Sequence, residues 1–507
     1  MWKRLLCLPL FASLSLLAAC YSELPPLELK GSLSVTFVDK LTDGASPDKL
    51  RKVARAGEVF KFKVSALNPD GKPNTGYNGK VCFYASRGVL VSPITPTVLK
   101  NGTVTKEVQI KLAFGRTTIW AAETSSDATS CTMERPTINI AGSAPAIYYE
   151  NLSISDVQTN PDFPFDSPLF RKYSVITQGK MVVTATTSNG FFVTDLDAYK
   201  KDPTGGYHSL FVFTFSAPSV VVEDGVPPRL LNLGEIVKQV EGGVDEFTGH
   251  TQLTFPSFKP DWVKEKNGDI RQVTPQEMPA PLSLPVDALW NSSKMEPMES
   301  ALVKITNAVS IPFPVTQDGW EQFRQWPVLI FNPKEESKRE ECEKKVFDEL
   351  HLKGEPSGSQ ATYIRKLKVC QQAREKEEAS RCASKKDKDK EACLSSTRSN
   401  FRRCVTNERR AMENRLASLC SFGMMLIVSN TKVPAYDPAD TANHFKRIPK
   451  IVGVLVQSTA SAYYQFRKDQ YRDEKSNNGY IMRVRCPKDL QRDKASNELC
   501  YGQDKSN

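Results

Sequence analysis

Two acidic residues near the middle of this 507-residue chain are the first whose types and spacing could do chemistry. Asp195 and Asp197 follow a predicted strand, and together with Asp245 or Glu246 they could hold a cation, because hard cations prefer carboxylate oxygens. The same residue types more often form turns. We favour the turn and expect no metal site.

The chain has only four histidines, and none has the spacing of a zinc site. His208 and His250 lie near strand ends of one predicted domain and could approach each other, but no third partner is evident. Motifs for a serine nucleophile elbow, a zinc protease, a phosphate-binding loop and a dinucleotide site are absent from the sequence. We therefore expect no catalytic residue, no cofactor, no small-molecule ligand and no enzyme activity. Both histidines are interpreted as surface or hydrogen-bonded residues.

The cysteines indicate an oxidising compartment. There are twelve, and none forms a C-x-x-C pair; Cys7 lies in an apolar N-terminal stretch and Cys20 follows it. The remaining ten are an even number, which suits disulfides better than metal binding. These ten are Cys82, Cys131, Cys342, Cys370, Cys382, Cys393, Cys404, Cys420, Cys486 and Cys500.

The N-terminus has the layout of a secretory signal peptide. Lys3 and Arg4 precede an apolar stretch over residues 5–16, and residues 17–20 read Leu-Ala-Ala-Cys. Small residues just before a cysteine resemble the lipobox of bacterial lipoproteins. The resemblance implies a diacylglycerol thioether and an acylated amino group on Cys20. An ordinary signal peptide and a membrane-spanning anchor are the alternatives, but the apolar stretch is too short for a stable span.

On this interpretation residues 1–19 are the signal peptide and residues 20–30 are a lipidated tether. Tyr21, in place of Asp, resembles the outer-membrane class of lipoproteins. The expected location is the outer membrane, where the lipid on Cys20 anchors a chain that faces the periplasm or the cell surface. Each buried methylene contributes about 0.8 kcal/mol, so the body of the protein needs no membrane surface of its own.

Residues 31–142 predict an antiparallel sandwich of about seven short strands. The runs over residues 56–83 and 99–121 resemble the bacterial Ig-like repeats of surface adhesins and invasins. A bond between Cys82 and Cys131 would close a loop of about 50 residues and contribute roughly 3 to 4 kcal/mol. We interpret this domain as a spacer.

A second strand-rich region, from Gln178 to Phe255, predicts a barrel. Its blocks, and two later groups of strands, resemble the OB-like domain found beside secreted bacterial nucleases. The matching blocks are residues 182–184, 190–195, 209–213, 242–249, 251–253, 298–308, 451–455 and 480–490. Nothing resembles the phosphodiesterase domain of those nucleases, so the resemblance implies a binding or scaffolding fold without the catalytic half. The OB-like domain is expected in two parts, residues 143–332 and 421–507, with residues 260–297 as a proline-rich loop that contributes shape and no chemistry.

An OB-type barrel usually binds across the exposed face of its central strands, where aromatic rings stack on bases or sugars. Strand alternation sends about half of the available rings inward, so core packing is the alternative role. Phe215, at the end of the apolar run that begins at Leu210, is a further available ring. The candidate binding face consists of Phe191, Phe192, Tyr207, Phe211 and Phe213.

Residues 333–420 interrupt this β domain with charged helix-forming residues. They contain 22 Lys and Arg against 16 Asp and Glu, so this segment carries +6 of the chain's net charge of +10. A basic arm that meets an acidic partner and a solvated helical face are both consistent with this composition. We favour the solvated face, because the acidic residues offset most of the charge.

Cysteine spacing predicts that this segment is a stapled helical hairpin. The pairs Cys370–Cys404 and Cys382–Cys393 share nearly the same sequence midpoint, so both could bridge two antiparallel helices. Six cysteines allow fifteen pairings, and geometry favours this nested set, with Cys342 and Cys420 closing the base. Outside the segment, Cys486 and Cys500 are expected to staple the C-terminal tail to the last strand.

The expected fold is mainly β: an N-terminal Ig-like β-sandwich, then an OB-like β-barrel domain interrupted by a disulfide-stapled α-helical hairpin. The expected function is that of a non-enzymatic, lipid-anchored binding or scaffold protein with a protein partner in an outer-membrane or cell-surface assembly. Surface capture of nucleic acid or acidic polysaccharide by the OB-like domain is the alternative. A hydrolase of unrecognised type is the second alternative.

Overall fold

The computed structural model describes most of the chain from residue 31 to residue 491. The described ranges are 31–41, 43–54, 56–131, 140–160, 166–172, 175–222, 228–264, 268–284, 292–310, 325–331, 341, 344–345, 359–419, 423–429, 447–457 and 480–491. The expected signal peptide, tether and lipidated Cys20 lie outside these ranges, as do Cys342, Cys420 and Cys500. Strands dominate what is described, which confirms the mainly-β prediction.

The chain divides into two compact units, residues 1–150 and 151–507. The first unit extends eight residues beyond the predicted boundary at residue 142. Ile147 and Tyr149 explain the difference, because both are buried in the core of the first unit. The predicted connector therefore begins as part of the sandwich.

The first unit is a sandwich of two four-stranded sheets, ordered β1-β2-β6-β4 and β5-β3-β8-β9. The strands are β1 Ser32–Phe37, β2 Glu58–Leu67, β3 Lys80–Ala85, β4 Val89–Ser92, β5 Thr97–Val98, β6 Thr103–Lys111, β7 Arg116–Thr117, β8 Ile119–Thr124, β9 Ala141–Ser143 and β10 Ile147–Tyr148. Strand β2 shows why they pair: Phe60, Phe62 and Val64 alternate with exposed residues, so one face enters the core. A disulfide joins Cys82 to Cys131 with a Cα–Cα distance of 5.5 Å, the pairing expected from the sequence.

The second unit begins with a closed five-stranded barrel, ordered β11-β12-β13-β17-β16. Its strands are β11 Val175–Thr187, β12 Gly190–Asp195, β13 Ser209–Phe213, β16 Ile236–Phe247 and β17 His250–Pro260. Only β13 and β17 run parallel; the other neighbours are antiparallel. Closure of five strands in this order is the OB-type barrel that the sequence predicts. We call it the first barrel.

Short elements surround the first barrel. These are α2 Ile154–Gln158, α3 Leu196–Lys201, the hairpin of β14 Ser219–Val220 with β15 Arg229–Leu230, the hairpin of β18 Trp262–Lys264 with β19 Asp269–Ile270, α4 Ser292–Met295 and the 3-10 turn η3 Glu296–Met298.

Later strands form a second closed ring instead of completing the first. The ring consists of β21 Leu302–Ser310, β22 Gln325–Phe331, β23 Gly423–Ser429, β24 Arg447–Gln457 and β25 Tyr480–Arg483, with edge strands β20 Leu282–Ser283 and β26 Leu490–Gln491 and the turn η8 Pro487–Asp489. Pairing runs β21-β22-β23-β25-β24 and back to β21, and β23 and β25 are parallel. This order repeats that of the first barrel. The single split domain expected from the sequence is therefore corrected to two barrels in tandem.

The two barrels pack against each other through an apolar contact. Ala185, Phe192 and Phe211 of the first barrel share a core cluster with Leu302 and with three valines of β24. The rings of Phe192 and Phe211 lie 4.6 Å apart in this cluster. The face that β12 and β13 turn away from their own barrel is consequently covered by the second barrel.

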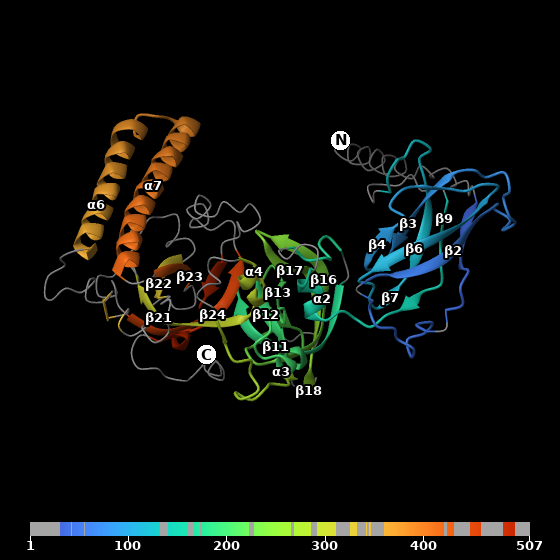
Figure 1. The fold of residues 1–507 in the computed structure, drawn as a ribbon, viewed down its shortest axis with the longest axis horizontal. Helices are drawn as coiled ribbons and strands as arrows, with labels where there is room; N and C mark the ends of the chain where they lie inside the picture. Colours follow the sequence, from blue (N-terminus) through green and yellow to red (C-terminus); the bar gives the residue numbers. More distant parts are fainter. Residues whose placement is uncertain are drawn as a thin grey trace, which may run out of the picture. The chain divides into compact units, whose positions relative to one another are not determined.

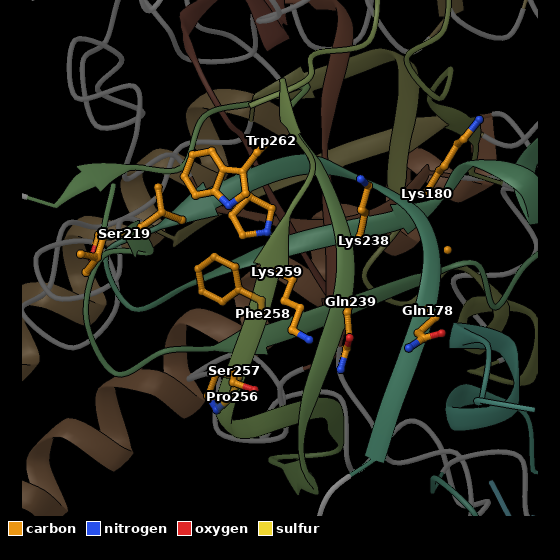
Figure 2. Close-up of a pocket in the computed structure, with 14 residues that line it drawn as sticks. Gln178, Lys180, Ser219, Lys238, Gln239, Pro256, Ser257, Phe258, Lys259 and Trp262 are labelled. Atoms are coloured by element: carbon orange, nitrogen blue, oxygen red, sulfur yellow. The ribbon is translucent and has the colours of Figure 1, made fainter. Parts of the chain in front are cut away.

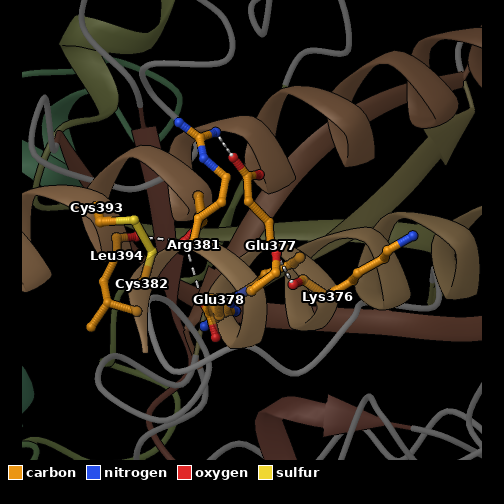
Figure 3. Close-up of a disulfide and its surroundings, with 10 residues drawn as sticks. Lys376, Glu377, Glu378, Arg381, Cys382, Cys393 and Leu394 are labelled. Carbon is orange, nitrogen blue, oxygen red and sulfur yellow. Dashed lines mark hydrogen bonds and ion pairs between the residues drawn. A yellow bond between two sulfur atoms is a disulfide. The ribbon is translucent and has the colours of Figure 1, made fainter. Parts of the chain in front are cut away.

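A helical hairpin is inserted between β22 and β23 (Figure 1). Helix α6 spans Ser359–Glu377, a π-helical turn follows over Glu378–Cys382, and α7 spans Asp387–Leu419. Disulfides join Cys370 to Cys404 and Cys382 to Cys393, with Cα–Cα distances of 5.8 and 5.6 Å. Figure 3 shows the second of them. These are the two nested pairs that the spacing predicts. None of the described helices is both long and apolar enough to cross a membrane.

Cys486 is disulfide-bonded as well. The predicted partner Cys500, and the predicted pair of Cys342 with Cys420, fall outside the described residues, so these two pairings stay predictions.

Candidate functional site

The five rings of the predicted binding face do not form an open surface. Phe191, Phe192 and Phe211 are buried, while Tyr207 and Phe213 are half-buried. Phe191 packs edge-on against Phe258 inside the first barrel, and Phe192 and Phe211 contact the second barrel. The second barrel thus occupies the face where an OB-type barrel usually binds, and the ligand face must be sought elsewhere.

Asp195 has a local structural role. Its carboxylate caps the N-terminus of α3 by accepting hydrogen bonds from the backbone N–H groups of Asp197 and Ala198, at 3.0 and 3.1 Å. Glu246 is engaged elsewhere, since it accepts from the Ser167 backbone N–H and the Thr251 hydroxyl. Among the described residues, no three His, Cys, Asp or Glu side chains gather in a way that could hold a metal ion.

His250 and Ser300 form an arrangement that resembles a nucleophile with its base. The Nε2 of His250 lies 2.8 Å from the Oγ of Ser300, and Ser300 has a positive φ of 62°. Both residues are buried, and neither lines a described cavity. Burial also lowers the pKa of His250 to about 3, which makes it a weak base. This pair therefore suits packing against Phe211 better than catalysis.

Buried carboxyl groups join the turn before β21 to both barrels. Glu296 accepts a hydrogen bond from the Tyr480 hydroxyl at 2.6 Å, and Glu299 accepts one from the Thr251 backbone N–H at 3.1 Å. Burial raises the pKa of Glu296 to about 7 and that of Glu246 to about 8, and it raises the pKa of Glu299 well above the ordinary range. We call Glu246, Glu296 and Glu299 the carboxyl cluster. Its members face protein groups and not a cavity, so its role is structural.

A large groove lies on the first barrel (Figure 2). Its volume is about 1030 Å³. Strands β11, β16 and β17 supply most of the lining, and β14 and β18 supply the rest. The residues that line it are Gln178, Gly179, Lys180, Ser219, Val220, Val221, Lys238, Gln239, Pro256, Ser257, Phe258, Lys259, Pro260 and Trp262. We call this the lysine groove.

Backbone irregularities create the lysine groove. The pairing of β11 with β16 shifts between Gln178 and Met181, and the pairing of β16 with β17 shifts near Lys238 and again near Gly242. Such bulges bend a strand and redirect its side chains. Three of them occur in strands whose lysines, Lys180, Lys238 and Lys259, line the groove and point in different directions from it (Figure 2).

The charges in the groove differ in how far they are neutralised. The Nζ of Lys238 lies 2.7 Å from the Asp261 carboxylate, so its charge is already compensated. Lys180 and Lys259 are exposed, and neither is in an ion pair among the residues that the structure describes, although Lys180 lies close enough to Glu277 to help lower the pKa of that carboxyl group. Lys259 is therefore fully available to an anionic ligand, and Lys180 is partly available.

The groove also presents flat apolar surfaces. Trp262 is half-buried at its rim, and Phe258 rests with its ring 5.0 Å from that of Phe191. Exposed ammonium groups bind phosphate, sulfate or carboxylate, and aromatic faces stack on planar rings or sugars. The described lining includes the hydroxyls of Ser219 and Ser257 but no histidine or carboxylate. The arrangement suits the binding of an anionic ligand.

Little in the sequence pointed to this groove. Lys180, Lys238 and Lys259 each look like ordinary solvent-facing strand residues, and Trp262 falls in the loop interpreted as shape without chemistry. That interpretation is corrected here, because Trp262 lines the groove. Aromatic residues close to exposed lysines in β17 were the available clue.

Comparison with known proteins adds little. No family model matches the chain, and no curated protein matches it. Among solved structures, the chain is similar to the D0-D1 domain of Intimin, with 18% identity over 24% of this chain and a TM-score of 0.16. The chain spans half the length of that structure. A score this low carries no argument, so the sandwich and barrel assignments rest on the strand pairings.

Proposed function

We propose that this chain is a non-enzymatic binding protein that captures an anionic polymer, nucleic acid or acidic polysaccharide, in the lysine groove of its first barrel. The observation that carries the proposal is that Lys180, Lys238 and Lys259 line one groove of about 1030 Å³ together with Phe258 and Trp262. Cations and aromatic faces in one groove are the combination with which proteins follow charged polymers.

The exposed lysines that are in no ion pair, Lys180 and Lys259, decide the class of ligand. Each contact between an ammonium and a polymer phosphate releases a condensed counterion, which favours binding at low salt. A neutral ligand would release no counterions, so Lys180 and Lys259 would contribute no such binding free energy. The proposal also includes the expected address: lipid on Cys20 would hold the chain at the outer membrane, with the sandwich as a spacer. An envelope-protein partner stays a prediction, because no described surface favours a protein partner as specifically as the lysine groove favours an anionic polymer.

A salt titration of the lipid-free mature chain tests the proposal. Fluorescence anisotropy with an oligonucleotide and with a sulfated polysaccharide would give the dissociation constants. We expect the double variant Lys180→Gln/Lys259→Gln to bind at least about tenfold more weakly. The slope of log K against log salt should become shallower by about 1.4, because two phosphate contacts at about 0.7 each are lost.

A matched control removes two lysines outside the groove. Lys61→Gln/Lys63→Gln changes the same net charge at exposed positions of β2 and should leave affinity and slope nearly unchanged. Equal losses in both double variants would show that binding depends on net charge and not on the groove. Failure of the unmodified chain to retain either polymer at low salt would refute the proposal.

A further inference from the structure

Two exposed phenylalanines lie beside the lysine groove. Phe215 is 56% exposed and Phe255 is 78% exposed, and their ring centroids are 4.9 Å apart. Phe213 packs on Phe215 at 4.4 Å, and Phe211 lies 6.4 Å behind Phe213. A row of rings therefore leads from the contact between the barrels to the surface, where its last two members face solvent. We call Phe215 and Phe255 the aromatic pair.

The backbone holds the aromatic pair in an uncommon conformation. Phe215 has a φ of 62° and Phe255 a φ of 47°. Positive φ is rare for a bulky residue without a glycine's freedom, and such positions persist only where the surrounding structure enforces them. Two adjacent examples, each bearing an exposed ring, are more than the scattered surface hydrophobic residues of an ordinary protein.

The aromatic pair continues the lysine groove along β17. Pro256, Ser257, Phe258 and Lys259 all line the groove, and Phe255 directly precedes them. The pairing of β17 with β16 shifts between Thr254 and Ser257, so Phe255 stands at a bulge beside the groove. Phe215 joins it because β13, which it follows, runs parallel beside β17. The aromatic pair therefore borders the groove that the lysines line.

We infer that the aromatic pair is a base-stacking subsite and that the ligand of the lysine groove is single-stranded nucleic acid. This inference rests on the proposed function and narrows its ligand. Unpaired bases can stack on exposed rings while their phosphates reach Lys259 and Lys180. The bases of a duplex are already stacked on each other, so no base face would be free to stack on Phe215 or Phe255. The charge of the lysines matches the phosphates, and the exposed rings match the bases.

Two oligomers of equal charge test the inference on the lipid-free mature chain. One is an oligothymidylate of about 12 nucleotides, and the other is an abasic strand with the same number of phosphates. The unmodified chain should bind the oligothymidylate about tenfold or more tightly than the abasic strand. Phe215→Ala/Phe255→Ala should reduce this preference to what stacking on Trp262 alone supplies and leave affinity for the abasic strand unchanged.

Two further variants keep the result interpretable. Phe215→Tyr/Phe255→Tyr retains both ring faces and should bind like the unmodified chain. Phe247→Ala removes a ring that is 63% exposed at the turn between β16 and β17, outside the aromatic pair and the groove, and should have no effect. Thermal melting of each variant identifies a folding defect; if the double Ala variant has one, the single variant Phe255→Ala, which removes the more exposed ring, carries the test and should still lower the preference for oligothymidylate.

The outcomes separate this inference from the proposed function. If the Ala variant keeps the full preference for oligothymidylate, the aromatic pair is not the stacking subsite, although dependence on Lys180 and Lys259 would still support the proposed function. Equal affinity of the unmodified chain for both strands, with tighter binding of sulfated polysaccharide, would overturn nucleic acid as the ligand. No binding to any of the three polymers would overturn both.

Discussion

The lysine groove and the helical hairpin are both basic, yet they are built differently. The hairpin, residues 359–419, contains 16 Lys and Arg against 8 Asp and Glu, a net charge of +8. Ion pairs neutralise part of the positive charge: Lys366 pairs with Glu408 and Arg374 with Glu378, each at 2.7 Å. The rest is spread along two solvated helices. The groove has three lysines, but all of them line one opening.

The difference shows that the sign and number of charges do not locate a ligand site. Exposed charges spread along helices interact weakly with a ligand, because water and salt screen each one separately. Charges that line one groove beside aromatic surface act on the same ligand at once. On this account the groove binds, and the hairpin is a rigid, solvated insert held by its own small core of Tyr363, Leu367, Phe401 and Val405.

The largest expected effect concerns the hairpin disulfides. Cys370→Ser/Cys404→Ser should destabilise the hairpin by about 2 to 4 kcal/mol, because the bond restricts a loop between residues 34 apart in the unfolded chain. Hydrogen exchange of the hairpin amides measures this loss. Cys382→Ser/Cys393→Ser removes a bond between residues only 11 apart and should destabilise the hairpin less. In both variants the affinity for the polymer should stay within about twofold of that of the unmodified chain. If affinity falls together with hairpin stability, the hairpin is part of the binding site.

The next effect is a pH dependence of the barrels. Carboxyls of the cluster have raised pKa values in the folded state, so the folded state holds protons that the unfolded state has lost. The free energy of unfolding should therefore fall as pH rises from about 4.5 to 8. His250 acts in the opposite direction, because its lowered pKa makes stability fall as pH drops from about 6.5 towards 3.

Glu299→Gln isolates the carboxyl contribution. The amide keeps an acceptor for the Thr251 backbone N–H but cannot ionise. Denaturant titrations at pH 5 and pH 8 should show a difference between the two pH values that is smaller by about 1 to 3 kcal/mol than in the unmodified chain. Hydrogen exchange of the hairpin, which lies outside the cluster, provides the internal reference. An undiminished pH dependence would remove Glu299 from this account.

A smaller effect is expected from the ring at the rim of the groove. Trp262→Ala should weaken polymer binding about tenfold, since one stacking face is lost. The salt slope should stay unchanged because no charge is removed, which distinguishes this variant from the lysine variants. Trp262→Phe keeps a face and should recover most of the affinity. A changed slope in the Ala variant would mean that the substitution disturbs the lysines.

The smallest effect is expected at the tip of the hairpin. Lys385, Lys386, Lys388 and Lys390 are exposed there, next to Asp387 and Asp389. Replacing all four lysines by glutamine should lower polymer affinity less than about threefold, because their charges do not converge on a cavity. Anisotropy at low salt measures the change. A loss above tenfold would reverse the comparison and make the hairpin the binding arm.

Local sequence patterns were sufficient for part of the fold. Alternation in β2 and in β11 to β13 predicted strands, and matched spacings predicted the pairs Cys370–Cys404 and Cys382–Cys393. Strand alternation depends only on residues close in the chain, and the two disulfide pairs depend only on the shared midpoint of one helical hairpin. The second barrel could not be predicted in this way, because its ring is closed by β21 and β24, which are separated by the whole insert.

The candidate site could not be predicted from the sequence for a related reason. Whether Phe192 and Phe211 form a ligand face depends on what covers them, and Leu302 and the valines of β24 cover them from far along the chain. Lys180 and Lys259 become a site only when separate strands bring them to one groove. Long-range packing decides both outcomes, and no local pattern encodes it.

Photo-crosslinking from the two basic regions tests the central claim most directly. A photoreactive residue would replace Ser257, which lines the lysine groove, or Ser384, which is exposed at the hairpin tip. Each protein would be irradiated with a labelled oligothymidylate at low and at high salt. The account predicts a crosslink from position 257 that disappears at high salt, and none from position 384. A crosslink from 384 without one from 257 would contradict it.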